Sequence, residues 1–437
     1  MRRGEGEAAA GSLAYRILRR AVEIERTEIA AAVGSFVTFA LVLGGYYLIR
    51  PVRENISAEA TADQRQLWFI LVFAIMLAAV PVFGWIVARV PRVAVLPVLY
   101  AFFVALMIFF WLALGAGGAA SSGLGGAFFV FGSVFNLFVV SLFWILMSDL
   151  YDSAQAKRLY GFIAAGGTTG AVLGPLAANR LVPVVGQDNL LLVAALVFAL
   201  AAVLSVWLRR AADANGSADK ASETPPTLRT LWSGAERVFR DSYLFRIALY
   251  VLIAILLSTF FYLVQSRLAG ETIADASERV QFFAERDLIT SILTVAVQVF
   301  LAGRIMERFG VSAAASVLPA ITIASLALYA AMPDLYVVAG IMVAERVTAF
   351  ALSNPAMKVL YTAVDVDERY KAQNFVDTVV YRGGDAMSGA LLNSLTKSMG
   401  LPFGGVALLS MPVAGFWLAL SSRFDRALNA RVAEHVR

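Results

Sequence analysis

The stretch RRAADANGSADKASETPPTLRTLWSGAERVFRD, residues 209–241, divides this chain and indicates its fold. It is a long polar interval between apolar segments, and it contains the turn-forming pairs Asn215-Gly216 and Pro225-Pro226. Six apolar segments precede it and six follow it, each close to the roughly 20 residues that a helix needs to cross a bilayer. They lie near 29–50, 66–88, 93–115, 124–147, 159–181, 189–208, 243–266, 281–302, 311–331, 335–356, 374–396 and 402–422. The sequence therefore predicts an all-α membrane protein with twelve transmembrane helices in two six-helix halves.

The composition indicates that lipid surrounds much of the chain. Hydrophobic residues make up 60% and charged residues 15%, and the mean hydropathy is +0.75. Soluble domains have about 45–50% apolar and about 25% charged residues, so a water-soluble chain of this composition could not cover its surface with polar groups. There is no cysteine, and the single histidine, His435, lies in a polar tail. Thiolate or histidine metal centres and a histidine-based triad are thereby excluded, and we expect no metal and no cofactor.

The distribution of lysine and arginine predicts the orientation in the membrane. If the N-terminus is cytoplasmic, most of these residues fall in cytoplasmic loops and tails, as the positive-inside rule requires. The external loops then hold Arg53, Arg65, Arg267, Arg279 and Lys397. We expect a multi-pass protein of the bacterial inner membrane with both termini cytoplasmic. The basic pI of about 9.4 is then explained without a nucleic-acid partner.

Five segments are expected along the chain. Residues 1–27 carry apolar positions such as Leu13 and Ile17 among several arginines, which predicts a cytoplasmic amphipathic arm on an anionic leaflet; a disordered basic arm is the alternative. The other segments are an N-terminal six-helix half at 28–208, a cytoplasmic linker at 209–242, a C-terminal six-helix half at 243–422 and a cytoplasmic tail at 423–437.

Two similar loops suggest an internal duplication. Gly84 and Arg89 follow the second span, while Gly303, Glu307 and Arg308 follow the eighth at the same offset. Both loops resemble the G-x-x-x-D-R-x-G signature of the major facilitator superfamily, whose fold consists of two parallel six-helix halves. We interpret these residues as a gating latch between the halves. The alternative is a positive-inside turn with a glycine cap.

Charged residues within the spans are the candidate site. Each costs about 2.5–3.5 kcal/mol to insert, so such residues usually face a cavity or a partner. The residues that we expect to bind an anionic substrate are Arg50, Arg53, Asp149, Arg346 and Arg382. The carboxylates expected to act in coupling or gating are Glu345, Asp377 and Asp385, of which the last two share one predicted helix face.

Internal ion pairs that fix helix packing are the alternative for these charges, with Glu345 and Arg382 as one example. We also hypothesise that Asp149 pairs with Arg53 in the empty site, the alternative being that it caps span four or pairs with Lys157 or Arg158. Arg286 and its acidic neighbours lie near the predicted external end of span eight and are interpreted as a partly solvated network. Small residues at Gly166 and Gly170 in span five indicate either close packing or gating.

Four blocks of the sequence resemble the ATP/ADP translocase, or nucleotide transporter, family. The family's segments L-R-D-T-K-D, S-L-L-F-W … E-A-K-R-F-Y, D-P-x-K-E-M-A-Y … L-D … K and D-V-x-x-x-R-x-G are similar, in that order, to residues 48–54, 141–160, 354–371 and 377–384. The chain departs from the pattern at Pro51, Arg53, Gln265 and Met357. The resemblance implies the major facilitator fold and the exchange or uptake of a nucleotide or a similar anion.

These observations together predict a secondary transporter of an organic, phosphorylated anion that works by alternating access. Its expected partners are this anion and membrane lipid, and a monomer is compatible with the sequence. A proton-coupled exporter of lipophilic compounds is an alternative, which would require one protonatable carboxylate and few cavity arginines. A membrane scaffold or sensor without transport is another. An enzyme is not expected, because no nucleophile–base pair stands out, and ATP-driven pumping is not supported, because there is no Walker-type loop.

Overall fold

Helices joined by short turns make up the computed structural model, which describes residues 24–25, 27–89, 92–115, 123–214 and 228–436. The predicted amphipathic arm lies almost entirely outside these residues. The helices of the N-terminal part are α2 (Ile29–Glu59), α3 (Ala62–Arg89), α4 (Arg92–Gly115), α5 (Gly123–Leu150), α6 (Ser153–Val185) and α7 (Leu190–Ala214). A shorter helix, α8 (Leu228–Arg240), lies within the predicted linker.

The C-terminal part contains π-helical turns, η1 to η4, within its helices. Its elements are α9 (Ser242–Thr272), α10 (Ala276–Val297), η1 (Gln298–Ala302), α11 (Gly303–Ala331), α12 (Leu335–Thr348), η2 (Ala349–Ser353), α13 (Asn354–Tyr361), α14 (Val366–Phe375), η3 (Val376–Val380), α15 (Tyr381–Asn393), η4 (Ser394–Ser398), α16 (Phe403–Ser421) and α17 (Phe424–Val436).

Twelve membrane crossings result from these helices, as the sequence predicts. Ten helical stretches among the described residues are long and apolar enough to cross a bilayer. One of them, 276–331, contains two crossings, because the backbone breaks at Gly310, whose φ of 86° lies in the left-handed region that favours glycine. The remaining crossing runs from α14 through α15 and is too polar to be recognised by hydropathy. The all-α fold with two six-helix halves is confirmed.

The break at Gly310 is stabilised from the C-terminal helix. The backbone N–H groups of Val311 and Ser312 donate to the carboxylate of Asp425 at 3.0 and 3.1 Å, and Ser312 Oγ accepts from the Asp425 N–H at 2.6 Å. A side chain on Gly310 would meet the same carboxylate at 2.4 Å. The start of span nine and the start of α17 therefore cap each other.

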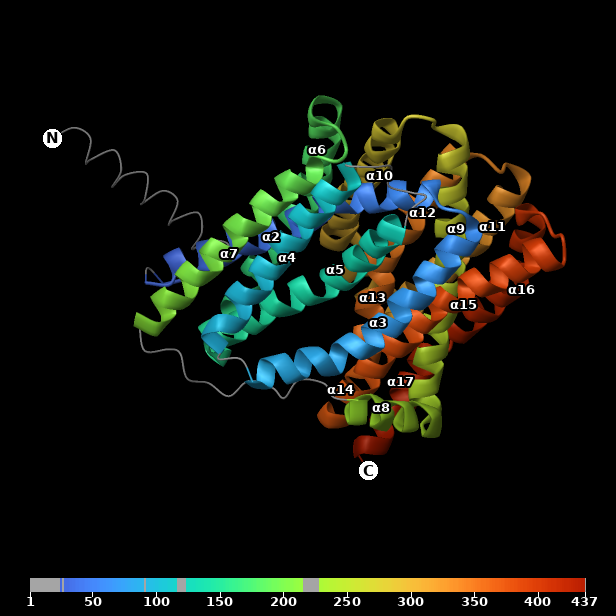
Figure 1. Cartoon of the computed structure of the whole chain (residues 1–437). Coiled ribbons are helices and arrows are strands. Elements are labelled where there is room, and N and C mark those ends of the chain that lie inside the picture. The colour runs from blue at the N-terminus through green and yellow to red at the C-terminus, as the bar shows by residue number, and fades with distance from the viewer. Residues whose placement is uncertain (1–23, 26, 90–91, 116–122, 215–227, 437) are drawn as a thin grey trace.

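The two halves lie side by side: α4, α5 and α7 are on the left of Figure 1, α9, α11, α15 and α16 are on the right, and α3 crosses toward α15. Between the halves, α2 packs on α9 and α10, α3 on α15, and α6 on α10. Within the N-terminal half, α6 packs tightly on α2: a Cβ on Gly166 or Gly170 would lie 2.2 Å from the carbonyl oxygen of Phe36 or Ala40. Of the two interpretations of these glycines, close packing is confirmed.

Several hydrogen bonds and ion pairs between the halves lie at one end of the described molecule. Arg279 donates to Asn55 at 2.6 Å and forms an ion pair with Glu59, which ties α10 to the end of α2. Lys397 pairs with Asp63 of α3. A pocket of about 800 Å³ lies among these segments. The helices α8, α14 and α17 lie at the opposite end (Figure 1). We call the end that holds Arg279, Glu59, Lys397 and Asp63 the sealed end.

Candidate functional site

Three charged residues of α2 line one side of this helix. Arg53 and Glu54 follow Arg50 by three and four residues, so both are its neighbours on the helix surface. Glu54 Oε1 lies 2.9 Å from Arg53 Nη2 and 3.7 Å from Arg50 Nε. The helix continues through Pro51, which removes a backbone donor in the turn that carries these charges. The side chain of Glu54 is fully buried.

Asp287 of α10 joins three arginines that come from three helices. Its Oδ2 lies 3.3 Å from Arg50 Nη1, and its Oδ1 lies 2.8 Å from Arg286 Nη2 and 3.1 Å from Arg346 Nη1. Arg50 belongs to α2 in the N-terminal half, whereas Arg346 belongs to α12 in the C-terminal half. Arg286 also donates to Gln265 of α9. A single buried carboxylate thus connects spans one, eight and ten.

Positive charge is in excess in this group of residues. Four arginines stand against two carboxylates, which leaves two positive charges without a counter-ion in the group. The side chains of Arg50, Arg53, Arg286 and Arg346 are 11%, 15%, 2% and 17% exposed, and those of Glu54 and Asp287 are 0% exposed. Unpaired charges cost several kcal/mol each in such surroundings, so this group is suited to an anion. We call these six residues the arginine cluster.

The cluster also offers unused hydrogen-bond donors and aromatic surfaces. The buried Nε atoms of Arg50 and Arg53 have no hydrogen-bond partner in the described structure. Arg50 lies over the ring of Tyr47, 5.4 Å from its centroid, and Arg53 lies 5.2 Å from the ring centroid of Phe129. Arg53 Nη1 also donates to Ser133 Oγ at 3.2 Å. Charged donors and aromatic rings therefore adjoin each other in the arginine cluster.

Arg382 pairs within its own helix. Its Nη1 lies 3.3 Å from Asp385 Oδ2, as the spacing of three residues predicts, and Thr259 of α9 donates to Asp385 Oδ1 at 2.7 Å. The common helix face of Asp377 and Asp385 stays a prediction. Asp377 lies in the π-helical turn η3, which shifts the helix register, and its exposed side chain pairs with Lys358 at 3.3 Å.

Glu345 is a buried carboxyl group that no cation pairs with in the described structure. It is 4% exposed, its Oε1 accepts a hydrogen bond from Thr322 at 2.8 Å, and its Oε2 has no partner. The ion pair between Glu345 and Arg382, given as an example of internal pairing, is wrong, because Arg382 pairs with Asp385 instead. The next residue after Glu345 is Arg346, a member of the arginine cluster.

Asp149 does not join the arginine cluster. It lies 3.0 Å from Arg209 of α7, so it links spans four and six within the N-terminal half. The hypothesised pair of Asp149 with Arg53 is wrong, because Arg53 pairs with Glu54. The alternative pair with Arg158 is not found either, since Arg158 binds Glu28 at 2.9 Å. The Asp149 carboxylate thus has a structural partner that the sequence did not indicate.

The loop signature residues lie away from the cluster along the chain. Gly84 and Arg89 belong to the last turns of α3, and their side-chain contacts lie outside the described residues. Glu307 and Arg308 are exposed, and no ion pair joins either to the N-terminal half in the described part of the chain. Gly303 begins α11 with open space beside its Cα. The latch between the halves stays a prediction.

Sequence reasoning missed three members of the arginine cluster. Arg286 and Asp287 are 3% and 1% exposed, so their interpretation as part of a partly solvated network is wrong. Only the neighbouring Glu285 is exposed, where it accepts a hydrogen bond from Asn179 at 3.1 Å. Glu54 was quoted as part of a motif but was not assigned to the site. The available signal was the run of three charges at 285–287 inside an apolar segment. Consecutive residues point to different sides of a helix, and only one side can be solvated, so some of these charges had to be buried.

Comparisons with known proteins agree with the helical arrangement. The profile described as Major Facilitator Superfamily matches residues 35–360. None of the curated proteins matches the chain in sequence. Similar solved structures include a bacterial homologue of the iron transporter ferroportin in an inward-facing state, which is 12% identical with a TM-score of 0.65 and covers 91% of this chain and 98% of that chain.

Two further solved structures extend this comparison. The nucleoside transporter NupG is 15% identical with a TM-score of 0.58, over 92% of this chain and 99% of that chain. The POT family transporter PepTSo is 13% identical with a TM-score of 0.65, over 92% of this chain and 98% of that chain. At these identities the likeness concerns the fold.

Proposed function

Because the chain belongs to the Major Facilitator Superfamily, we propose that it is a secondary transporter that moves an organic, phosphorylated anion by alternating access. The observation that carries this proposal is the arginine cluster, with two buried positive charges in excess. Guanidinium groups bind phosphate oxygens in a bidentate manner, whereas lysine acts as a point charge. The solved structures with this fold are described as a homologue of an iron transporter, a nucleoside transporter and a POT family transporter, so the substrate class is argued from the cluster.

The cluster is suited to coupling substrate binding to movement of the halves. Arg50 and Arg53 come from the N-terminal half, and Arg286 and Arg346 from the C-terminal half. An entering phosphate group takes the place of Asp287 as partner of these arginines. Since arginines of both halves contact the same anion, the relative position of the halves changes the affinity for it. This is the differential binding that alternating access requires.

A nucleotide-like substrate fits the surroundings of the cluster. The ring of Tyr47 lies beside Arg50, where a base can stack while the arginines hold its phosphates, and the buried ring of Phe129 supports Arg53 from the core. The resemblance of four sequence blocks to the ATP/ADP translocase family supports the same substrate class. We further propose a bacterial inner-membrane location with cytoplasmic termini, which makes the sealed end external.

Ligand-induced stabilisation of the purified protein tests this function, because a ligand that binds the folded state raises Tm. We expect nucleoside triphosphates and diphosphates to raise Tm, and nucleosides without phosphate to have little effect. Arg346→Gln should abolish the rise. The matched control is Arg267→Gln, which changes an arginine that is 43% exposed and pairs with Glu271 on the same helix. Equal stabilisation by nucleosides and nucleotides would show that phosphate is not recognised.

The buried carboxyl group of Glu345 supports a second function, the coupling of transport to protons. An ionised carboxylate without a cationic partner is costly in a buried site, so this side chain is suited to carry a proton. We propose that Glu345 takes up and releases the coupling proton beside Arg346. The excess of arginines argues against the export of lipophilic compounds, for which few cavity arginines are expected. Glu345→Gln should abolish uptake driven by a pH gradient while substrate exchange continues; loss of both, or of neither, contradicts this role.

A further inference from the structure

The linker helix α8 is held against the C-terminal half at the end opposite the sealed end. It runs across the lower end of α9 in Figure 1 and packs on α14. The approach is close, since a Cβ on Gly234 would lie 2.3 Å from the carbonyl oxygen of Lys371. Val238, four residues later, is 1% exposed and belongs to the core. One face of α8 is therefore fixed by packing.

A second side of α8 exposes large aromatic residues. Trp232 and Phe239 are 76% and 69% exposed, and a spacing of seven residues places them on one side of the helix. The ring of Phe239 lies 6.1 Å from that of Phe245, which is 41% exposed near the start of α9. Because α9 is a transmembrane helix, the aromatic side of α8 continues the apolar surface that meets lipid.

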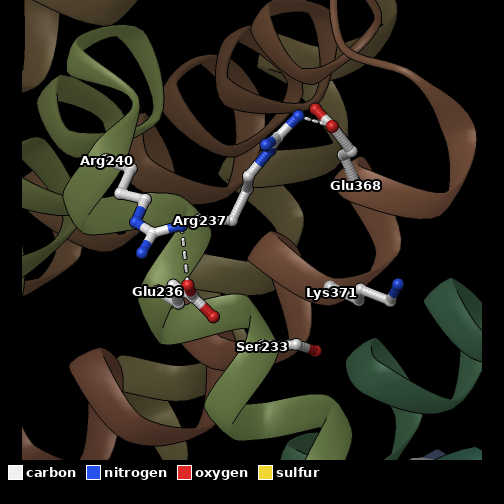
Figure 2. A pocket seen from close by; sticks show the side chains of 6 residues that line it. All are labelled: Ser233, Glu236, Arg237, Arg240, Glu368 and Lys371. Atoms are coloured by element: carbon white, nitrogen blue, oxygen red, sulfur yellow. Dashed lines mark ion pairs between the residues drawn. The ribbon is translucent and has the colours of Figure 1, made fainter.

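A third side of α8 is charged and borders a pocket of about 260 Å³. Its lining residues are Ser233, Glu236, Arg237, Arg240, Glu368 and Lys371. Figure 2 shows two ion pairs in it, one between Arg240 and Glu236 at 2.8 Å and one between Arg237 and Glu368. Three cationic side chains and two carboxylates thus line this pocket.

We propose that α8 is an interfacial helix that binds an anionic phospholipid, with the phosphate in this pocket and the acyl chains along Trp232 and Phe239. Tryptophan prefers the boundary between water and hydrocarbon, and basic residues beside it attract anionic headgroups. An aromatic side next to a basic side is the pattern of helices that lie in the membrane plane. A lipid meets both sides at once, whereas free phosphate meets the charged side alone.

The site adjoins the segment that leads to Arg382. Arg237 pairs with Glu368 of α14, and α14 continues through η3 into α15. A lipid phosphate that binds Arg237 competes with Glu368 for this arginine. The contact between α8 and α14 is then sensitive to the lipid composition of the adjacent leaflet.

Single cysteines in the naturally cysteine-free chain test the placement of α8. A spin label is attached at Trp232→Cys or Phe239→Cys in the full-length protein in lipid nanodiscs, with Ser233→Cys on the pocket side as the matched control. We expect the first two labels to be relaxed more strongly by oxygen than by a water-soluble nickel chelate, and the control to show the reverse. Stronger relaxation by the nickel chelate at both aromatic positions would overturn the proposal.

Binding of the headgroup is measured by native mass spectrometry of protein released from nanodiscs that contain phosphatidylglycerol and phosphatidylcholine. We expect retained phosphatidylglycerol to fall at least several-fold in the variant Arg237→Gln, Arg240→Gln, Lys371→Gln. The control variant Arg267→Gln, Lys397→Gln at the sealed end should retain it. Undiminished retention in the first variant would refute the site. Displacement of the lipid by millimolar inorganic phosphate would show that the pocket recognises free phosphate instead.

Discussion

Arg50 Nη1 of the N-terminal half lies 3.3 Å from Asp287 Oδ2 of the C-terminal half. The Arg50 side chain is 11% exposed and that of Asp287 is fully buried, so this ion pair crosses between the halves in a site with little water. Two more arginines share the same carboxylate. Asp287 thus holds the position that we propose for the anionic substrate, and its removal tests the proposed exchange of partners.

Replacement Asp287→Asn should make the folded protein depend on an added anion. Removing one partner of a buried ion pair costs about 3–5 kcal/mol, because the remaining charge stays buried without compensation. We expect a lower Tm without ligand and a larger rise on addition of nucleotide than in the unchanged protein. Thermal unfolding in detergent measures both.

The matched control for this replacement is Glu285→Gln, two residues earlier on α10. Glu285 is exposed and accepts a hydrogen bond from Asn179, so its neutralisation should leave both Tm and the ligand response nearly unchanged. If Asp287→Asn had the same ligand response as the unchanged protein, Asp287 would be a packing residue and not the stand-in for the substrate.

Arg53 and Asp149 should act independently of each other. They pair with Glu54 and Arg209, which belong to different helices. Distant residues without shared partners have additive effects within about 0.3–0.5 kcal/mol. A double-mutant cycle of Arg53→Gln and Asp149→Asn on nucleotide affinity is therefore expected to give no coupling beyond that range. A coupling above about 1 kcal/mol would restore the direct exchange between these two residues.

The sequence predicted the fold well because the signals for membrane spans are local. The length of each apolar segment and the polar interval at 209–241 can each be read from one continuous stretch of sequence. Even the polar eleventh crossing was recognised in this way. Site partners were predicted less well because they depend on how helices rotate against each other. Asp149 meets Arg209 across two spans, and Asp287 faces the interior although Glu285 does not. The π-helical turn η3, which carries Asp377, is likewise not indicated by any local sequence pattern.

The proposed orientation predicts which single cysteines react from outside intact cells. Ser398 and Ser422 are both exposed, but Ser398 lies by the sealed end and Ser422 between α16 and α17 at the other end. Ser398→Cys should react with a membrane-impermeant maleimide, and Ser422→Cys should react after the cells are opened. The absence of cysteine from the natural chain removes background labelling. Labelling of Ser422→Cys in intact cells would reverse the topology.

Gly270 should control whether the sealed end can close. It lies near the end of α9, where a Cβ would come 2.3 Å from the carbonyl oxygen of Ala58 at the end of α2. A backbone atom cannot move aside as a side chain does, so Gly270→Val should keep the two halves apart at this end. We expect a cysteine placed at Ser57, which is fully buried beside Ser266, to become reactive from outside in this background, while transport falls at least tenfold. Gly415→Val is the control, because a Cβ on Gly415 meets no atom within 4 Å. Unchanged protection of the cysteine at position 57 in the Gly270→Val protein would show that this contact does not seal the path.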